Sequence, residues 1–438
     1  MNYIPNILFA IILVFGIGYF IRNIKKLIRN IKLGHDVDVS DNKSQRWKNM
    51  MMIAIGQSKM VRRPIAGFLH VIVYLGFIVI NIEVVEIIID GLFSGVLYKE
   101  HRIFSGIGSL YGVLIGIFEI LAILVFISVI VFWIRRMILR IPRFWNKEMT
   151  KWPKNDALNI LYFEMVLMSL FLIMNATDVH FQELNSGNLI SQYISVWFSN
   201  FSISTLHLIE RLAWWLHIIG ILIFLNYLYF SKHLHILLAF PNTFYGNLNP
   251  KGELNNLEAV TKEVMLMMDP DADPYAAPTE NEEEPAKFGA SDVQDLNWVQ
   301  LLNAYTCTEC GRCTSECPAN QTGKKLSPRK IMMDTRDRLE EVGKNIDANK
   351  GVFKEDGKQL LDDYISKEEL WACTSCNACV EACPVSINPL SIIIEMRRYL
   401  VMEQSAAPTE LNNMMTNIEN NGAPWPYNQM DRLNWKNE

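Results

Sequence analysis

Five long apolar runs lie in the first 240 residues, at 4–24, 67–90, 108–134, 156–176 and 206–230. A helix needs about 20 apolar residues to cross roughly 30 Å of hydrocarbon. One such run could be a buried core helix, but five together predict a membrane-spanning helical bundle. No basic segment precedes the first run and no small-residue cleavage site follows it. We therefore expect a membrane span there and not a signal peptide.

The charge changes sign along the chain. Residues 1–240 carry a net charge of +8 and the remaining residues carry −13. Early in the second part, the stretch DPDADPYAAPTENEEEPAKFG is rich in Pro, Ala and acidic residues, as flexible linkers often are. We therefore predict a transmembrane domain at 1–240, an acidic linker at 241–290 and a soluble domain at 291–438. Nucleic-acid binding is disfavoured, because the net charge is negative and the basic residues flank apolar runs.

The basic residues predict the orientation of the bundle. Eleven Lys and Arg lie at the junction of the first two runs and seven at that of the third and fourth, whereas the other connections have only Lys99 and Arg102. Cytoplasmic loops carry the excess of positive charge. We therefore expect the N-terminus outside and residues 231–438 in the cytoplasm.

All eight cysteines lie in two copies of the pattern C-x2-C-x2-C-x3-C-P, written CTECGRCTSECP and CTSCNACVEACP. This is the run of bacterial two-cluster ferredoxins, in which the fourth cysteine binds the other cluster. It predicts two [4Fe–4S] clusters with crossed ligands. The first set is Cys307, Cys310, Cys313 and Cys383; the second is Cys317, Cys373, Cys376 and Cys379. Zinc sites, the main alternative, do not need two runs of four cysteines with trailing prolines.

Helices are expected around these motifs, at 326–345, at 355–371 and in the apolar stretch after Pro389. The predicted fold class is mainly α: a five-helix transmembrane bundle followed by a soluble α-helical two-[4Fe–4S] ferredoxin-like domain. No nucleophile triad, phosphate loop or dinucleotide fingerprint is present. The chain is therefore expected to move electrons.

Histidines in the apolar runs indicate haem b. An imidazole in hydrocarbon is costly unless it is paired or ligates a metal, and haem iron is held by neutral imidazole nitrogens. His70 lies near the cytoplasmic end of the second run, and His233 and His235 close the fifth, at a similar depth. We predict one haem between His70 and His235, with His233 as the alternative ligand. His217 lies deeper, where the second run has no histidine, so a second haem on His217 stays open.

Acidic residues within the runs form a second signal. Glu83 and Glu86 lie one turn apart on the second run, and Glu210 and Arg211 lie near the outer end of the fifth. Such groups usually mark a proton or substrate path. We predict proton exchange with a quinone headgroup near the outer surface. The alternative is a structural ion pair of Arg211 with Glu83 or Glu86.

The whole pattern resembles the heterodisulfide-reductase-related membrane iron–sulfur oxidoreductases, which join a nitrate-reductase-gamma-like membrane domain to a two-cluster ferredoxin domain. The segment from Phe288 through CTECGRCTSECPAN to GKKLSP is similar to the branch with the electron-transfer-flavoprotein:menaquinone oxidoreductases. The tail ENNGAPWPYNQMDRLNW is similar to the segment that leads, in that family, into cysteine-rich (CCG-type) repeats.

The resemblance also bears on the haem ligands. The two fifth-span histidines of gamma-type domains lie 18 residues apart, as His217 and His235 do, which favours His235 over His233. The second span of those domains carries two histidines, whereas this chain has only His70 there. The number of haems therefore stays open.

The resemblance implies an oxidoreductase subunit in the bacterial cytoplasmic membrane. It would pass electrons between a cytoplasmic partner, such as electron-transfer flavoprotein, and menaquinone through the clusters and haem b. The cysteine-rich module is expected as a separate subunit. Two alternatives remain: a heterodisulfide-reductase-type subunit that sends quinol electrons to a thiol or disulfide partner, and a haem-free membrane anchor that docks a catalytic partner.

Overall fold

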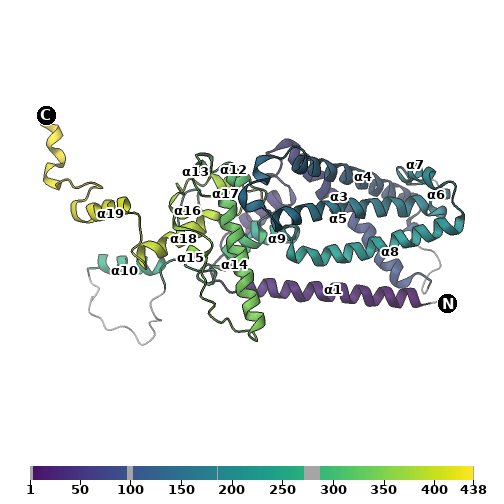
Figure 1. Cartoon of the computed structure of the whole chain (residues 1–438), viewed down its shortest axis with the longest axis horizontal. Helices are drawn as coiled ribbons and strands as arrows, with labels where there is room; N and C mark the ends of the chain where they lie inside the picture. The colour runs from purple at the N-terminus through teal and green to yellow at the C-terminus, as the bar shows by residue number, and fades with distance from the viewer. Residues whose placement is uncertain (1–2, 96–101, 185, 271–286, 438) are drawn as a thin grey trace.

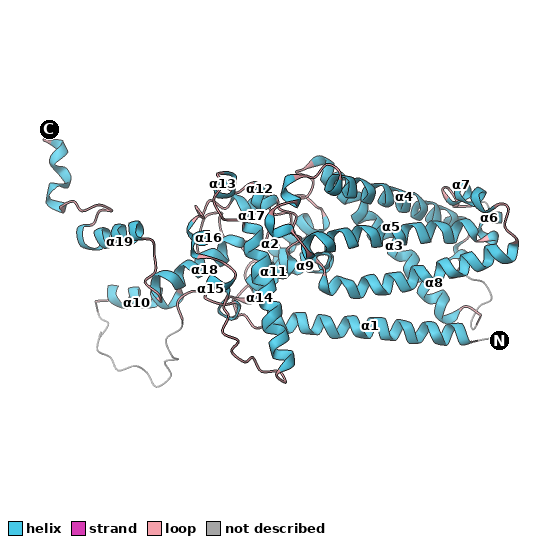
Figure 2. Cartoon of the chain, in the orientation of Figure 1, coloured by secondary structure: helices cyan, strands magenta, loops and turns pink. Residues whose placement is uncertain are grey.

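The computed structural model describes all residues except 1–2, 96–101, 185, 271–286 and 438 (Figure 1). The described residues form helices and loops without a strand (Figure 2). Two isolated β-bridges are the extended pairings in this part of the chain. A bundle of long helices lies at one end and the cysteine-containing half at the other (Figure 1). The predicted fold class is confirmed.

Five helices are long and apolar enough to cross a membrane, and they coincide with the five predicted runs. They are α1 (Ile4–Ile31), α3 (Pro64–Phe93), α4 (Ser109–Met137), α5 (Trp152–Thr177) and α8 (Ile203–Tyr227). Helix α1 packs on α3 and α8, α3 on α4, α4 on α5, and α5 on α8. The five helices therefore close into a ring.

Small residues allow the helices to approach closely. A Cβ atom on Gly76 of α3 would lie 2.4 Å from Cγ2 of Val125 on α4. A Cβ atom on Gly220 of α8 would lie 2.9 Å from a methyl group of Leu167 on α5. Small residues at such contacts are typical of helices that associate in membranes, because van der Waals packing drives the association there.

Shorter helices connect and extend the bundle. They are α2 (Lys43–Met50), a π-helical turn at Met51–Ile55, α6 (Val179–Leu184), α7 (Ser191–Ser195), α9 (His235–Phe244) and α10 (Glu258–Met268). Helix α9 runs across the predicted domain boundary at residue 240, and α10 lies inside the predicted linker. Most of the acidic linker sequence falls at 271–286, outside the described residues.

The cysteine-containing half consists of short helices around one long one. They are α11 (Trp298–Thr306), α12 (Arg312–Ser315), α13 (Pro318–Gln321), α14 (Pro328–Ala348), α15 (Leu360–Asp363), α16 (Lys367–Trp371), α17 (Ala378–Ala382), α18 (Pro389–Met402) and α19 (Thr409–Asn421). The helices expected at 326–345 and after Pro389 are present as α14 and α18. A single helix at 355–371 is wrong, because the backbone leaves helical geometry at Leu361 and Asp362 and Ser366 caps a separate α16.

The two halves pack against each other at the end of α1 that bears Leu27 and Asn30. One hydrophobic core runs from Leu27 on α1 to Leu301 on α11 and Leu339 on α14. The side-chain amide of Asn30 donates a hydrogen bond of 3.0 Å to the hydroxyl of Tyr305. A Cβ atom on Gly343 of α14 would lie 2.4 Å from that Asn30 side chain, so glycine permits the contact. The position of the cysteine motifs relative to the bundle is therefore set by packing.

Candidate functional site

The structure brings the first predicted set of cysteines together. Cys307, Cys310, Cys313 and Cys383 line one cavity, although Cys383 belongs to the second motif. We call these four residues cage 1. Burial raises the pKa of the Cys307 thiol to about 12. Burial also raises the pKa of Cys383, to about 11. A metal bound by these two thiols has to displace their protons.

The second set is also assembled. Burial is the main cause that raises the pKa of Cys379 to about 12, and the charges of its neighbours Cys373, Cys317 and Cys376 act in the same direction. We call these four residues cage 2. Cys317 and Cys379 are buried, whereas Cys376 is exposed to solvent. Cage 2 is thus the cage that reaches the surface.

The two motifs fold into matching loops. Glu309 and Gly311 in the first motif have φ values of +54° and +70°. Ser375 and Asn377, at the same positions of the second motif, have φ values of +55° and +59°. Left-handed residues within such turns point successive backbone N–H groups to one side and form an anion-binding concavity. Glycine and asparagine tolerate this conformation best.

The lining of cage 1 suits a cluster site. Among the residues that the structure describes, no three His, Cys, Asp or Glu side chains converge as ligands of one metal ion. The thiols of cage 1 surround a cavity that also contacts Met332 and Ile387. Four separated thiols around a cavity suit a cubane, in which each sulfur binds a different iron.

A buried charge network joins cage 1 to the bundle. The ammonium of Lys232 contacts the carboxylate of Glu309, which lies between Cys307 and Cys310, and donates 2.6 Å to the carbonyl of Pro153. Arg336 of α14 donates to the other oxygen of Glu309 at 2.8 Å. Burial opposes ionisation of Glu309, but the charges of Lys232 and Arg336 hold its pKa below the ordinary value. The cluster loop is therefore fixed to the membrane domain.

The backbone of Lys232 also connects this network to the histidines. Its carbonyl lies 3.1 Å from Nδ1 of His235, and its N–H donates to Asp156 at 3.1 Å. The fifth span ends at Phe230, because Ser231 is extended, and α9 begins at His235. The fifth span therefore ends at the predicted residue 230, and His233 and His235 lie just beyond it.

The rings of His70 and His235 lie opposite each other, with centroids 6.4 Å apart. Two imidazoles bound at about 2 Å on opposite sides of one metal ion have ring centres roughly 6 Å apart. The contact with Lys232 occupies Nδ1 of His235 and leaves Nε2 for a metal, while Nδ1 of His70 is buried without a hydrogen-bond partner. These residues fit the axial ligands of a haem.

The other two histidines have different surroundings. Nε2 of His233 lies 3.7 Å from the carboxylate of Glu164 on α5. Nδ1 of His217 lies 3.0 Å from the carbonyl of Leu167. His217 shares a second, mainly apolar cavity with Ile80 of α3.

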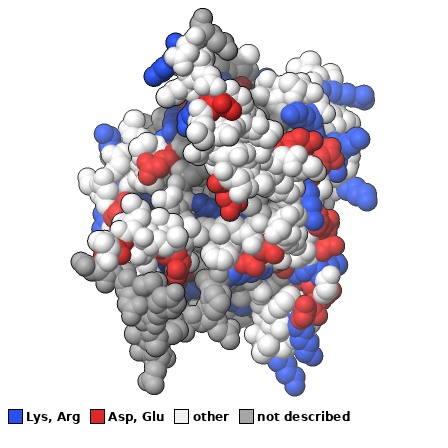
Figure 3. All heavy atoms as spheres, turned by 90° about the vertical axis from the view of Figure 1, so that its left-hand side faces the viewer, with Lys and Arg blue, Asp and Glu red and all other residues white. Residues whose placement is uncertain are grey.

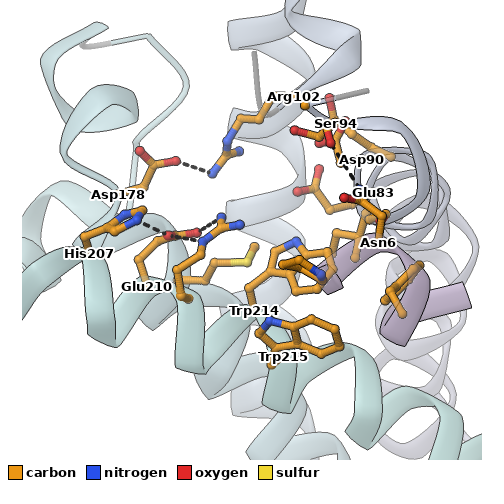
Figure 4. A pocket seen from close by; sticks show the side chains of 18 residues that line it. Asn6, Glu83, Asp90, Ser94, Arg102, Asp178, His207, Glu210, Trp214 and Trp215 are labelled. Carbon is orange, nitrogen blue, oxygen red and sulfur yellow. Dashed lines mark hydrogen bonds and ion pairs between the residues drawn. The ribbon is translucent and has the colours of Figure 1, made fainter. Parts of the chain in front are cut away.

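The end of the bundle away from the cysteine-containing half holds a cavity of about 430 Å³ between α1, α3 and α8, which we call the outer cavity. All four acidic and basic candidates, Glu83, Glu86, Glu210 and Arg211, line it. Glu83 and Arg102 point towards its interior, and Trp214 and Trp215 lie opposite Asp90 and Ser94 (Figure 4). Its lining combines charged and polar side chains with the aromatic rings of Phe9, Trp214 and Trp215, which suits a small organic ligand that carries polar groups.

The polar groups of this cavity are unevenly satisfied. Arg102 donates to Asp178 at 3.1 Å and to Asn175 at 3.0 Å. Glu86 accepts hydrogen bonds from the backbone of Phe104 and from Tyr111. Oε2 of Glu83 is buried and has no hydrogen-bond partner. A polar ligand could therefore pair with Glu83.

Arg211 contacts its neighbour Glu210, and no ion pair with Glu83 or Glu86 occurs among the described residues. The alternative of a structural pair between α3 and α8 is therefore wrong. Sequence reasoning missed Arg102 and His207, which both line the cavity. Arg102 lies in a loop and carries no periodic signal, so only its tertiary contacts identify it.

Comparison with known proteins agrees with this geometry. Residues 306–387 match the family model of the 4Fe-4S dicluster domain. The chain is 29% identical to the probable iron-sulfur-binding oxidoreductase FadF of Bacillus subtilis, over 99% of this chain and 61% of the relative. It is 25% identical to the EtfAB:quinone oxidoreductase of Syntrophomonas wolfei, over 92% of this chain and 55% of the relative.

A third relative is one component of the dihydromethanophenazine:CoB--CoM heterodisulfide reductase of Methanosarcina mazei, 30% identical over 34% of this chain and 36% of the relative. No solved structure matches the chain. The chain spans 61% of the first of these relatives and 55% of the second. The resemblance to heterodisulfide-reductase-related and electron-transfer-flavoprotein:quinone oxidoreductases is confirmed. The chain is related to iron–sulfur oxidoreductases and carries a 4Fe–4S dicluster domain beside membrane helices.

Proposed function

We propose that this chain is a membrane-bound electron-transfer subunit that links a cytoplasmic redox partner to menaquinone. When bound, two [4Fe–4S] clusters and haem b supply one-electron redox centres. The observation that carries the proposal is the order of the sites. Glu309 in the loop of cage 1 contacts Lys232, which lies in the turn just before His235. Cage 1 therefore lies next to the histidines.

The chain's own residues define the two ends of this path. Cys376 exposes cage 2 at the cytoplasmic end, where a partner protein can approach. Figure 3 shows the end of the molecule that faces away from the membrane helices, with acidic and basic side chains both on its surface. Salt-sensitive docking of a charged redox protein suits such a surface.

His70 and His235 would hold one haem b near the inner face, and the carbonyl of Lys232 would orient His235. Metal-binding histidines commonly donate their second ring nitrogen to a backbone carbonyl, which fixes the ring. His233 is engaged by Glu164, which favours His235 as the ligand. A second haem on His217 lacks a second histidine among the described residues, since Ile80 shares its cavity.

The outer cavity would bind the menaquinone headgroup. Its aromatic floor of Trp214 and Trp215 can stack on a naphthoquinone ring, and Glu83 can exchange a proton with a carbonyl oxygen. The names of the relatives support a quinone as substrate and electron-transfer flavoprotein as partner. We further propose that a cysteine-rich (CCG-type) module completes the activity.

The orientation follows from the basic loops, with the N-terminus outside and the cages in the bacterial cytoplasm. A reducing compartment keeps eight free cysteines available for clusters. Flow in the reverse direction, from quinol to a thiol or disulfide partner, uses the same residues.

The test is a redox difference spectrum and a reoxidation assay on the anaerobically purified chain in lipid nanodiscs. We expect a low-spin haem b spectrum that disappears in a His70→Ala variant. A soluble naphthoquinone should reoxidise the reduced wild-type protein. Full iron–sulfur loading without any haem b would overturn the proposal in favour of a haem-free membrane anchor.

A further inference from the structure

Three cations surround the membrane-facing side of cage 1. Arg312, between Cys310 and Cys313, is only 4% exposed. Its guanidinium donates to the carbonyls of Lys59 and Met60, both at 3.1 Å. Arg143 lies beside Gly311 of the same loop, and its Nε is buried without a hydrogen-bond partner.

Neighbouring cations at this interface are neutralised by carboxylates. Arg329 pairs with Glu148 at 2.7 Å, and Arg63 pairs with Glu316 at 2.8 Å. In the described part of the chain, by contrast, Arg312, Arg143 and Lys59 have no carboxylate within ion-pair distance. A buried cation without a counter-ion is costly unless an anion is supplied from elsewhere.

The thiols of cage 1 are the nearest candidates for that anion. The charge of Arg312 acts on Cys310 and Cys383. The charge of Arg143 acts on Cys310, and that of Lys59 acts on Cys383. Since both halves of the protein cover this region, water screens these interactions less than it would at the surface.

Cage 2 has a different environment. Arg397 acts on Cys373, and its guanidinium is held by the carbonyls of Leu370 and Cys373. Cys376 is exposed, and water there also stabilises added negative charge. Cage 2 thus has one neighbouring arginine and one exposed thiol, whereas cage 1 has three neighbouring cations, of which Arg312 is buried. This electrostatic difference therefore stabilises added negative charge more at cage 1 than at cage 2.

We propose that Arg312, Arg143 and Lys59 give a cluster in cage 1 a higher reduction potential than one in cage 2. Reduction potentials of such clusters depend on nearby charge, on hydrogen bonds to the sulfurs and on exposure. The transfer moves one electron and no proton: the cluster in cage 2 is oxidised and the cluster in cage 1 is reduced. An electron supplied by a cytoplasmic redox protein is then more stable on the membrane side. This inference rests on the proposed function for the groups that the cages hold.

The test is a redox titration of the whole chain in nanodiscs, followed by electron paramagnetic resonance. A Cys376→Ser variant changes the spectrum of the cage 2 cluster and so assigns the signals. In the wild type we expect cage 1 to be reduced first. In Arg312→Gln we expect the equilibrium for sharing an electron between the cages to shift about tenfold towards cage 2, which is 59 mV for one electron.

Matched variants separate charge from structure. Arg312→Lys keeps the charge and should restore most of the wild-type potential. Arg143→Gln removes a guanidinium that makes no hydrogen bond in the described structure, so it should lower the cage 1 potential even if Arg312→Gln fails to fold. Lys358→Gln, at an exposed lysine paired with Glu341 away from both cages, should leave both potentials unchanged.

Two outcomes would overturn the inference: a cage 1 potential at or below that of cage 2, or equal potentials in wild type and Arg143→Gln. Failure of the proposed function has a different signature. A protein that keeps the potential difference but never reduces a quinone would refute the quinone role and leave the effect of these cations intact.

Discussion

The ammonium of Lys232, three residues before His235, contacts the carboxylate of Glu309 between two cysteines of cage 1. Both side chains are at least nine-tenths buried. Lys232→Met leaves Glu309 and Asp156 with less compensation, so we expect a loss of folding stability on the order of 3 kcal/mol. Lys232→Arg should lose less. Thermal unfolding of the purified protein, monitored by loss of cluster absorbance, measures both; equal melting temperatures for wild type and Lys232→Met would contradict the role of this pair.

Crossed ligation predicts which cluster each cysteine affects. Cys317 belongs to the first motif, but we expect Cys317→Ser to alter only the spectrum of the cluster held by Cys373, Cys376 and Cys379. Cys383→Ser should alter the other one. Iron and sulfide should approach about eight atoms each per chain, since two cubanes hold four of each. A Cys317→Ser spectrum that changes only at the first motif's cluster would show that the ligands do not cross.

The haem prediction distinguishes four histidines. His70→Ala and His235→Ala should abolish the low-spin haem b signal, because each removes one axial imidazole. His233→Ala should keep the haem, since His233 contacts Glu164. His217→Ala should also keep this inner haem. Reduced-minus-oxidised spectra and a pyridine haemochrome assay measure the content, and loss of haem in His233→Ala alone would reassign the ligand.

The outer cavity predicts a role for an unpaired carboxylate. Glu83→Gln preserves the shape of the side chain but cannot exchange a proton, so we expect quinone reduction to slow by about a hundredfold. The main effect should be on kcat. Glu183→Gln, at an exposed position on the same end of the bundle, is the control. Equal rates for wild type and Glu83→Gln would place the headgroup elsewhere.

Orientation is measured with reporter fusions. A reporter that works only in the cytoplasm should be active when it is fused after Glu438. A reporter that works only outside the cytoplasm should be active when it is inserted near Ser191. Ser191 begins α7, which follows α5 at the end of the bundle away from the cysteine-containing half (Figure 1). The opposite pattern would refute the charge argument and place the cages in an oxidising compartment.

Local sequence patterns were sufficient for much of this protein. Twenty-residue apolar runs predict membrane helices because each span satisfies its own backbone hydrogen bonds, whatever its neighbours are. The cysteine spacing and trailing prolines predict two equivalent loops. The structure agrees, because left-handed residues recur at matching positions of both loops. The pairing of His70 with His235 follows from equal depth in the membrane. Each of these inferences depends on distances along the chain.

Only the tertiary structure decided the rest. The break at Ser231 starts a new helix at His235, a single helix at 355–371 does not form, and Arg211 does not pair with Glu83. The contact of Lys232 with Glu309 joins residues 77 positions apart. The sequence contains all of these charged groups. It does not show which of them are buried away from water and which have a counter-ion. That depends on how the bundle and the cysteine-containing half pack, because burial and pairing together decide what a charge does.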